Sequence, residues 1–379
     1  MDKVNPRTGV SDCTVYSYLC YNALYRQVMA EQCPKTCNKC PGAGNSASTS
    51  TCVDLVNPRT GVSDCTKTSS YCRNSLYQQL MREQCPRTWM KWALILVWFS
   101  FATAAPSSFD ATYADDVARN KMLPLAAAAY AKNPQTCLTN KFTNAELKRQ
   151  LNVKCDSFRS DKCSGFTAVL NGDKAIVLSF RGTDAFLQLV SESDQSVFSK
   201  QIAWIGGGKV SKYFNDAFMD VWNGGMKDDF NTLRAKYPTY QVWVTGHSLG
   251  GAMATLAASY LVAANLVPAA NVELVTFGQP RTGNKDFSAA HDKQMSYTFR
   301  VTHSRDIVPH VPPEDLEGYY HHKYEAFYHN HMKPGASFEV CAADEDKGCS
   351  DGLDVTTSID EHLHYFDVDV NVYGEKGCK

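Results

Sequence analysis

The sequence feature that most constrains the fold is a glycine-rich turn between a strand-like segment and a helix-like segment. The turn reads Gly246-His247-Ser248-Leu249-Gly250, and a further glycine follows it. Residues 240–245 before it favour a strand, and the Ala-rich residues 249–264 after it favour a helix. Glycine lets a strand and a helix approach closely because it has no Cβ to clash. We therefore predict a sharp strand–turn–helix unit that exposes the Ser248 hydroxyl above the edge of a sheet.

The rest of the chain beyond residue 105 alternates between strand-like and helix-like segments. Short apolar runs that favour strands occur at residues 175–180, 240–245, 272–277 and 297–302. A long amphipathic stretch covers residues 213–236. Alternation of this kind is typical of an α/β fold with a mostly parallel sheet covered by helices. We expect residues 106–379 to form one such domain.

The first 89 residues contain a self-repeat instead. Residues 4–14 and 56–66 both read V-N-P-R-T-G-V-S-D-C-T, and a Gly-, Ser- and Ala-rich stretch lies between the two copies. We predict a module over 1–40, a linker over 41–51 and a second module over 52–89. Nine of the fifteen cysteines precede residue 90, which indicates disulfides and an oxidising compartment.

Both modules resemble the six-cysteine ShKT family, although each has an incomplete set of cysteines. Pairing the second with the fourth and the third with the fifth cysteine, as in that family, implies the disulfides Cys13–Cys33, Cys20–Cys37 and Cys65–Cys85. It leaves Cys40, Cys52 and Cys72 without their usual partners.

Residues 90–105 have the anatomy of a secretory signal peptide. Met90 and Lys91 precede an apolar run, and Ala102-Thr103-Ala104 offers a small-residue cleavage site. The apolar run is shorter than the roughly 20 residues of a membrane span, so we expect secretion without a stable span. Our hypothesis is that a gene-model error or alternative splicing fused residues 1–89 to a product that begins at Met90. The alternatives are a buried core helix and a signal anchor.

Charge gives little sign of a nucleic-acid partner. The formal net charge is −1, the basic excess of the first modules is mild, and no basic stripe is interleaved with aromatic residues. We expect no nucleic-acid binding.

The Ser248 turn points to nucleophilic catalysis. A serine hydroxyl is a weak nucleophile at neutral pH and needs a histidine base that a carboxylate orients. Asp306 follows the strand-like residues 297–302 and is the favoured acid, with a turn or helix-capping aspartate as the alternative. Two histidines near the C-terminus, His362 and His364, are candidates for the base, and the residues alone do not separate them.

A hydrolase of this kind also needs donors for the oxyanion. The Leu249 amide at the start of the helix is one, and an amide near Thr183, after the strand-like residues 175–180, is the second. Gly206-Gly207-Gly208 is a superficial rival that we interpret as a flexible hinge.

These motifs together resemble the class 3, fungal-type lipases, with five strings in the family's order. The strings are S-F-R-G-T (179–183), V-T-G-H-S-L-G-G-A (244–252), V-T-F-G-Q-P-R-T-G (275–283), S-R-D-I-V-P-H-V-P (304–312) and H-L-H-Y-F (362–366). The resemblance implies an α/β-hydrolase fold. It also implies a Ser248–Asp306–His362 triad, oxyanion donors at Thr183 and Leu249, and no metal or organic cofactor. It further implies the disulfides Cys137–Cys378, Cys155–Cys163 and Cys341–Cys349.

Lipases of this type carry a short amphipathic lid after the oxyanion strand. Residues 184–194 occupy that position here, and Phe186, Leu189 and Val190 share one helical face. We expect this segment to close over the site in water and to open at a lipid surface. The alternative is that the three side chains simply belong to the core.

Two histidine pairs, His321-His322 and His329-x-His331, are a possible metal-binding pattern. We expect a solvated loop instead, because no matching cysteine or carboxylate spacing accompanies them.

The combined prediction is a secreted serine ester hydrolase that acts in lipid catabolism. We expect a triacylglycerol lipase that works through an acyl-enzyme on lipid or ester substrates at a lipid–water interface. A phospholipase or a feruloyl-type esterase is the nearer alternative, and a binding or toxin-like protein acting through its ShKT modules is the alternative of another class.

Overall fold

The computed structural model describes Ser63 and residues 112–155, 162–191, 196–314, 316–353 and 355–379. The chain separates into two compact units, Met1–Ser107 and Ser108–Lys379. The predicted modules, linker and signal-like segment lie outside the described residues apart from Ser63. The same holds for the predicted pairs Cys13–Cys33, Cys20–Cys37 and Cys65–Cys85, and for Cys40, Cys52 and Cys72.

The second unit is built on an eight-stranded sheet in the order β1-β2-β3-β6-β7-β9-β11-β12. Its five middle strands, from β3 to β11, pair in parallel, and the strands at both edges pair antiparallel. The sheet is therefore mostly parallel, as predicted. The strands are β1 (Ala145–Lys154), β2 (Lys162–Leu170), β3 (Ala175–Phe180), β6 (Gln241–His247), β7 (Val272–Phe277), β9 (Thr298–His303), β11 (Glu325–Tyr328) and β12 (Glu339–Cys341).

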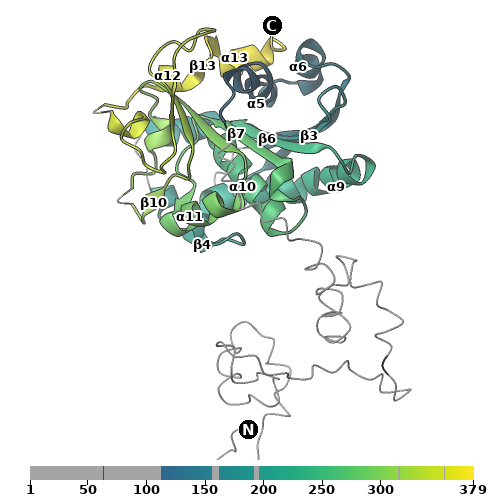
Figure 1. Ribbon diagram of the computed structural model, residues 1–379, viewed down its shortest axis with the longest axis horizontal. Coiled ribbons are helices and arrows are strands. Elements are labelled where there is room, and N and C mark those ends of the chain that lie inside the picture. Colours follow the sequence, from purple (N-terminus) through teal and green to yellow (C-terminus); the bar gives the residue numbers. More distant parts are fainter. Residues whose placement is uncertain (1–62, 64–111, 156–161, 192–195, 315, 354) are drawn as a thin grey trace, which may run out of the picture. The chain divides into compact units, whose positions relative to one another are not determined.

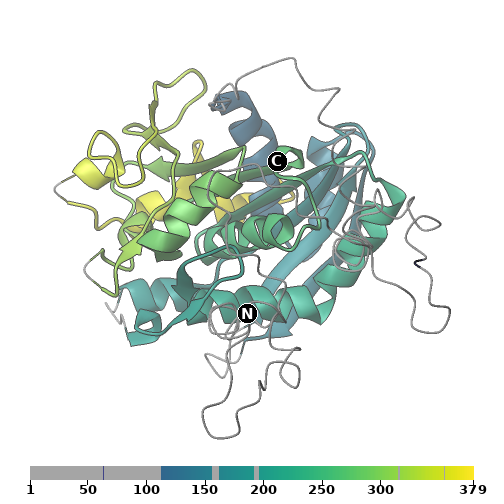
Figure 2. The same ribbon diagram turned by 60° about the horizontal axis from the view of Figure 1, so that its bottom comes forward.

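Helices cover both faces of this sheet (Figure 1). On one face lie α4 (Asp115–Val117), α5 (Leu123–Ala128), α6 (Pro134–Lys141) and α13 (Val370–Glu375), with the π-helix Ala118–Met122 joining α4 to α5. On the other lie α8 (Lys212–Val221), α9 (Lys227–Lys236), α10 (Leu249–Ala263) and α11 (Lys285–Gln294). Figure 2 turns the second face forward and shows its teal and green helices crossing the sheet.

The smaller elements lie in the segments that connect the main strands and helices. The short helices are α7 (Asp184–Ser191), α12 (Ile359–Leu363) and the 3-10 turns Ser196–Phe198, Ala269–Asn271, Val308–His310 and Ser350–Gly352. A second sheet has the order β10-β8-β5-β4. Its strands are β4 (Gln201–Ala203), β5 (Lys209–Ser211), β8 (Gly283–Asn284) and β10 (Tyr319–Tyr320), and β13 (His364–Tyr365) pairs with β14 (Val368–Asp369).

The central strands are apolar along their whole length because both of their faces are covered. Every residue of β3 is buried, and so is nearly all of β6 and β7. One core cluster, which includes Phe180 and Trp222, fills the space between the sheet and the α8–α11 layer. The other, which includes Phe166 and Phe299, lies under α5 and α13. Burial of this apolar surface is the main driving force for the fold.

The predicted amphipathic stretch at residues 213–236 is two helices rather than one. α8 and α9 are separated by the π-helical turn Trp222–Met226, inside which Gly225 has φ 133°. Arg149 from β1 lies against this glycine, since a Cβ there would come within 2.7 Å of its Nη2. The same guanidinium donates to the Gly225 carbonyl and to the Asp229 carboxylate. The break therefore admits a charged side chain from the sheet edge.

Gly206-Gly207-Gly208, predicted to be a flexible hinge, connect two short paired strands. The three glycines form the turn of a hairpin between β4 and β5. The Trp204 amide donates to the Gly208 carbonyl, and the Gly207 amide donates to the Trp204 carbonyl. These hydrogen bonds close the turn of the hairpin.

The described part of the second unit contains three disulfides, Cys137–Cys378, Cys155–Cys163 and Cys341–Cys349. They are the pairs that the family resemblance implies. Among the residues that the structure describes, no helix has the length and apolar character needed to cross a bilayer.

Candidate active site

The Ser248 turn joins β6 to α10 in a strained backbone conformation. Ser248 has φ 63° and ψ −133°, and its amide donates to the Phe277 carbonyl at 2.9 Å. A Cβ on Gly250 would lie 2.3 Å from the Phe180 carbonyl oxygen, so the helix can start this close to the sheet only with glycine. An outlier of this kind is typical of a nucleophile turn.

Asp306 and His362 form a buried hydrogen-bonded pair. Asp306 follows β9, and His362 lies on α12; an isolated parallel bridge between Asp306 and Ser358 aligns the two segments. His362 Nδ1 lies 2.9 Å from Asp306 Oδ1 and 3.0 Å from Oδ2. The exposed fraction is 1% for Asp306 and 0% for His362. The structure thus brings together the acid and the base that the family resemblance implies.

Three donors keep the Asp306 carboxylate ionised. Burial alone would raise its pKa, but His362, the Tyr365 hydroxyl and the Val308 amide together hold that pKa below its usual value. Tyr365 donates to Oδ2 at 2.6 Å, and the Val308 amide donates to Oδ1 at 2.8 Å. A carboxylate held in this way fixes the imidazole with its proton on Nδ1 and leaves Nε2 to accept a proton.

His247, next to the serine, connects the turn to His362. The two imidazole rings stack with centroids 4.6 Å apart, and His247 Nε2 lies 2.8 Å from the His362 carbonyl oxygen. Burial, and then the neighbouring His362, lower the pKa of His247 to about 3, so its ring is neutral. A carbonyl only accepts, so Nε2 carries the proton and Nδ1 accepts from the Tyr130 hydroxyl at 2.8 Å.

Tyr130 extends this network to the loop after β3. The Gly182 amide donates to the Tyr130 oxygen at 3.1 Å. Gly182 also packs against the serine, because a Cβ on it would lie 2.8 Å from the Ser248 Cβ. Sequence reasoning missed Tyr130 and His247. For His247 the signal was its place inside the glycine motif, whereas Tyr130 has no local signal.

The serine and the base are both covered. Ser248 is 1% exposed, and within the described part of the chain neither Ser248 Oγ nor His362 Nε2 has a hydrogen-bond partner. The two atoms are therefore not bonded to each other in this conformation. Catalytic hydrogen bonds in ligand-free enzymes are often long and tighten when substrate binds.

The family comparisons agree with this geometry. The family described as "Lipase (class 3)" matches residues 177–316, and "ShK domain-like" matches residues 4–40 and 51–88. The Caenorhabditis elegans protein "Lipase ZK262.3" is 36% identical over 301 residues, which are 71% of this chain and 84% of that protein. The chain belongs to the class 3 lipase family. The ShKT resemblance of the N-terminal repeat is confirmed as well.

Fungal lipases are similar in sequence and in fold. The Rhizopus niveus lipase is 36% identical over 210 residues, and this class 3 lipase spans about half (51%) of its length. The solved "lipase II from Rhizopus niveus" has a TM-score of 0.59 at 28% identity, covering 71% of this chain and 98% of that one. A structure described as "a serine protease triad forms the catalytic centre of a triacylglycerol lipase" has a TM-score of 0.57 at 27% identity, covering 66% and 94%. The predicted α/β-hydrolase fold and ester-hydrolase class are confirmed.

The predicted oxyanion residues of this lipase flank the Ser248 turn. Leu249 is the first residue of α10. Thr183 directly follows Gly182, which packs on the serine. The Thr183 hydroxyl accepts from the Phe186 amide at 3.1 Å, and its carbonyl accepts from the Leu187 amide. Thr183 therefore caps the start of α7.

The predicted lid segment forms the helix α7. Phe186 is fully buried, stacks on Tyr213 and packs edge-on against Phe198; Val190 is 5% exposed. Gln188 faces solvent. The Leu189 side chain lies outside the described residues. In this conformation the apolar face of α7 packs against α8, with Phe186 on Tyr213 and Phe214.

The other histidines that the sequence analysis considered differ in their exposure and their hydrogen-bond partners. His364, the first residue of β13, is partly exposed, and its Nδ1 donates to the Asp360 carbonyl of α12 rather than to Asp306. The prediction of a solvated loop is wrong for His321 and His322, which are 4% and 1% exposed. They lie between β10 and β11, where the His322 ring stacks on His291 of α11 and His321 Nε2 lies 2.7 Å from the Pro309 carbonyl oxygen. His329 and His331 are exposed, as expected.

Proposed function

We propose that this class 3 lipase is a secreted triacylglycerol lipase of lipid catabolism with Ser248, Asp306 and His362 as its triad. The observation that carries the proposal is the buried Asp306–His362 pair, at 2.9 Å, beside the strained turn that presents Ser248. The similar solved triacylglycerol lipase, in which a serine-protease triad forms the catalytic centre, supports it.

The geometry gives each residue one step. Ser248 Oγ attacks the ester carbonyl carbon, and His362 Nε2 takes the hydroxyl proton as that bond forms. The imidazolium, stabilised by the Asp306 carboxylate, then gives this proton to the departing alcohol, which leaves an acyl-enzyme. Water, deprotonated by the same nitrogen, releases the fatty acid and restores Ser248.

Charge on the oxyanion needs prepared donors. The Leu249 amide lies at the N-terminus of α10, whose dipole favours negative charge. The main chain at Thr183 is the second donor group in this proposal. It is held beside Ser248 by the contact of Gly182 with the serine.

Substrate access requires a movement, because Ser248, Asp306 and His362 are all at most 1% exposed. We assign this movement to α7, which begins right after Thr183 and has a polar face toward solvent and an apolar face toward α8. Its displacement would expose Phe186 and Val190, and a lipid surface would compensate for their exposure. This accounts for action at a lipid–water interface.

Secretion fits the disulfides in the described part of the second unit and the signal-like residues 90–105. N-terminal sequencing of the protein from culture medium tests it. A mature start shortly after residue 104 is expected, and a start within residues 1–89 would refute the processing hypothesis.

The activity test compares Ser248→Ala with the exposed-site control Ser296→Ala. Hydrolysis of tributyrin should fall by orders of magnitude in Ser248→Ala only. A fluorophosphonate should label intact protein on Ser248, as read by peptide mass spectrometry. Normal turnover by Ser248→Ala would disprove the triad.

A substrate panel resolves the ester class. Triacylglycerol, phospholipid and feruloyl ester are each assayed below and above their aggregation thresholds. We expect the highest kcat/KM with triacylglycerol and a rise in rate above its threshold. A preference for either other ester would replace the triacylglycerol assignment and leave the triad intact.

A further inference from the structure

Three potential metal ligands converge away from the triad, between α11 and the segment after β10. His291 and Asp292 are neighbours on α11, and His322 follows β10. One ligand atom from each residue lies within 4.8 Å of the others. The His291 and His322 rings stack with centroids 4.0 Å apart.

His291 is the least explained side chain of this group. It is 1% exposed, yet within the described residues neither Nδ1 nor Nε2 has a hydrogen-bond partner. A buried imidazole always has at least one N–H to satisfy, and leaving a buried polar group without a partner costs about 1–3 kcal/mol. A ligand that binds one ring nitrogen directly would remove part of that cost.

His322 is oriented as a ligand histidine usually is. Its Nδ1 lies 2.8 Å from the Lys323 carbonyl oxygen, so Nδ1 carries the proton and Nε2 has the lone pair. Histidine ligands in metal sites commonly donate their second nitrogen to a backbone carbonyl in this way. Nε2 accepts from the Gln279 side-chain amide at 3.2 Å, a hydrogen bond that a bound ion would replace.

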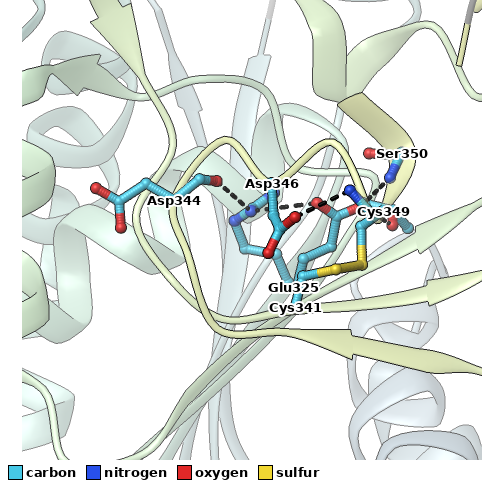
Figure 3. Close-up of a disulfide and its surroundings, with 9 residues drawn as sticks. Glu325, Cys341, Asp344, Asp346, Cys349 and Ser350 are labelled. Atoms are coloured by element: carbon cyan, nitrogen blue, oxygen red, sulfur yellow. Dashed lines mark hydrogen bonds and ion pairs between the residues drawn. A yellow bond between two sulfur atoms is a disulfide. The ribbon is translucent and has the colours of Figure 1, made fainter. Parts of the chain in front are cut away.

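A second carboxylate comes from the loop closed by the Cys341–Cys349 disulfide. The backbone carbonyl of Asp344 accepts from Arg300, and in Figure 3 its carboxyl group points away from the disulfide. That carboxyl lies within hydrogen-bonding reach of the Asp292 carboxyl. Two carboxyl groups held together are stabilised by a shared proton or by a cation.

The surrounding charge leaves room for a cation. Among the described residues, Arg300 and Lys323 are the cations that act on His291 and Asp292, and Arg300 is paired with the buried Glu325 at 3.5 Å. The carboxylates Asp292, Asp344 and Glu325 outnumber these two cations. A divalent ion would therefore correct an excess of negative charge.

We propose that His291, Asp292, His322 and Asp344 form a structural zinc site that fastens α11 to the Cys341–Cys349 loop. This departs from our sequence-based expectation that the chain binds no metal. Two imidazoles with two carboxylates suit the tetrahedral N/O coordination of Zn²⁺, whereas Ca²⁺ and Mg²⁺ prefer oxygen ligands alone. On zinc binding, the Cys341–Cys349 loop and α11 would move slightly toward each other.

The experiment is zinc titration of the full-length protein after treatment with EDTA and removal of the chelator. Isothermal calorimetry should give one zinc per chain, EDTA should lower the melting temperature, and zinc should restore it. Co²⁺ in place of zinc should give the strong visible absorption of a four-coordinate site. No zinc binding by the wild-type protein would overturn the proposal.

Two variants and two matched controls locate the site. His291→Leu replaces the unpartnered imidazole with an apolar side chain that the core can accept, and Asp344→Asn removes only the loop charge. Each should weaken zinc binding by about tenfold or more. Asp286→Asn, exposed on the same helix, and Asp346→Asn, in the same loop, should bind as the wild type does. Unchanged affinity in both His291→Leu and Asp344→Asn would place the zinc elsewhere and refute the assignment.

Discussion

Gly278 packs directly against the imidazole of His362. It has φ +55°, and a Cβ on it would lie 2.8 Å from both Nδ1 and Cε1 of that ring and 2.8 Å from Asp306 Oδ2. The absence of one methyl group therefore allows the acid and the base to lie at hydrogen-bonding distance.

We predict that Gly278→Ala separates this pair. A methyl group at 2.8 Å must displace the ring or the carboxylate, and a misplacement of about 1 Å can cost about a hundredfold in rate. We expect kcat on tributyrin to fall by about tenfold to a hundredfold, while KM changes little.

Gly335→Ala is the matched control for this change. Gly335 also has a positive φ, +79°, but a Cβ there would meet no atom within 4 Å. Both variants carry the backbone cost of about 1 kcal/mol for alanine at positive φ, so Gly335→Ala measures that cost alone and the melting temperature of Gly278→Ala should fall further. Equal kcat values in the two variants would show that the contact with His362 is irrelevant.

The Tyr130 hydroxyl supports the active site from behind, and we predict that Tyr130→Phe loosens it. The change leaves the Gly182 amide without its acceptor and His247 Nδ1 without its donor. Each unsatisfied buried group costs about 1–3 kcal/mol. We expect the free energy of unfolding in guanidinium to fall by about 2–6 kcal/mol for the two groups together. We expect kcat to fall as well, because His247 holds the main chain of His362.

Tyr373→Phe, on α13, is the control for removing a tyrosine hydroxyl. If Tyr130→Phe lost stability but kept the wild-type kcat, the network would be structural only.

Buried neutral histidines should make the fold sensitive to acid. Burial, and then the Arg281 guanidinium, lower the pKa of His310 to about 4. Between about pH 6.5 and pH 4 the unfolded chain binds a proton here and the folded chain does not, so stability falls as pH falls. The slope for one such group is about 1.4 kcal/mol per pH unit.

We therefore predict that His310→Gln flattens the pH dependence of the free energy of unfolding by about that slope in this window. Guanidinium titrations at several pH values between about 7 and 4.5 measure it. The exposed His331→Gln serves as control. A His310→Gln profile parallel to that of the wild type would contradict the prediction.

The Cys137–Cys378 disulfide should be the most stabilising of the three. It closes a loop of 241 residues, whereas Cys155–Cys163 closes one of 8. Loop-closure entropy gives about 5 kcal/mol for the long loop and about 2.5 kcal/mol for the short one. Double cysteine-to-serine variants, compared by guanidinium unfolding, should differ in that order. The reverse order would mean that native-state contacts at the two bridges outweigh chain entropy.

The sequence predicted the central layer of the fold better than its periphery. The runs at residues 175–180 and 272–277 coincide with β3 and β7, because a strand buried on both faces is apolar from end to end. The hairpin of β1 and β2 was not predicted. Only Leu151 of β1 is buried, so this edge strand needs few apolar residues and its sequence is mostly polar. The strands of the second sheet have two or three residues each, too few for a periodic pattern.

The site residues also divide into those that the local sequence predicts and those that it does not. Ser248 and Asp306 could be chosen from local pattern, because each follows a recognisable strand. The choice of His362 over His364 needed the family resemblance, since two histidines only two positions apart, at the end of α12 and the start of β13, have the same local sequence context. His321 and His322 were misjudged because their burial comes from α11, a distant segment that leaves no mark on the local sequence.

The Thr183 hydroxyl has a consequence for how the enzyme is switched on. The hydroxyl accepts a hydrogen bond from the Phe186 amide and so caps the start of α7. Thr183 also belongs to the loop in which Gly182 packs against Ser248. In the proposed mechanism, Thr183 is therefore both the residue at which the lid helix α7 begins and one of the two oxyanion donors. Displacement of α7 at a lipid surface would then expose Ser248 and position the oxyanion donor at Thr183 in the same movement.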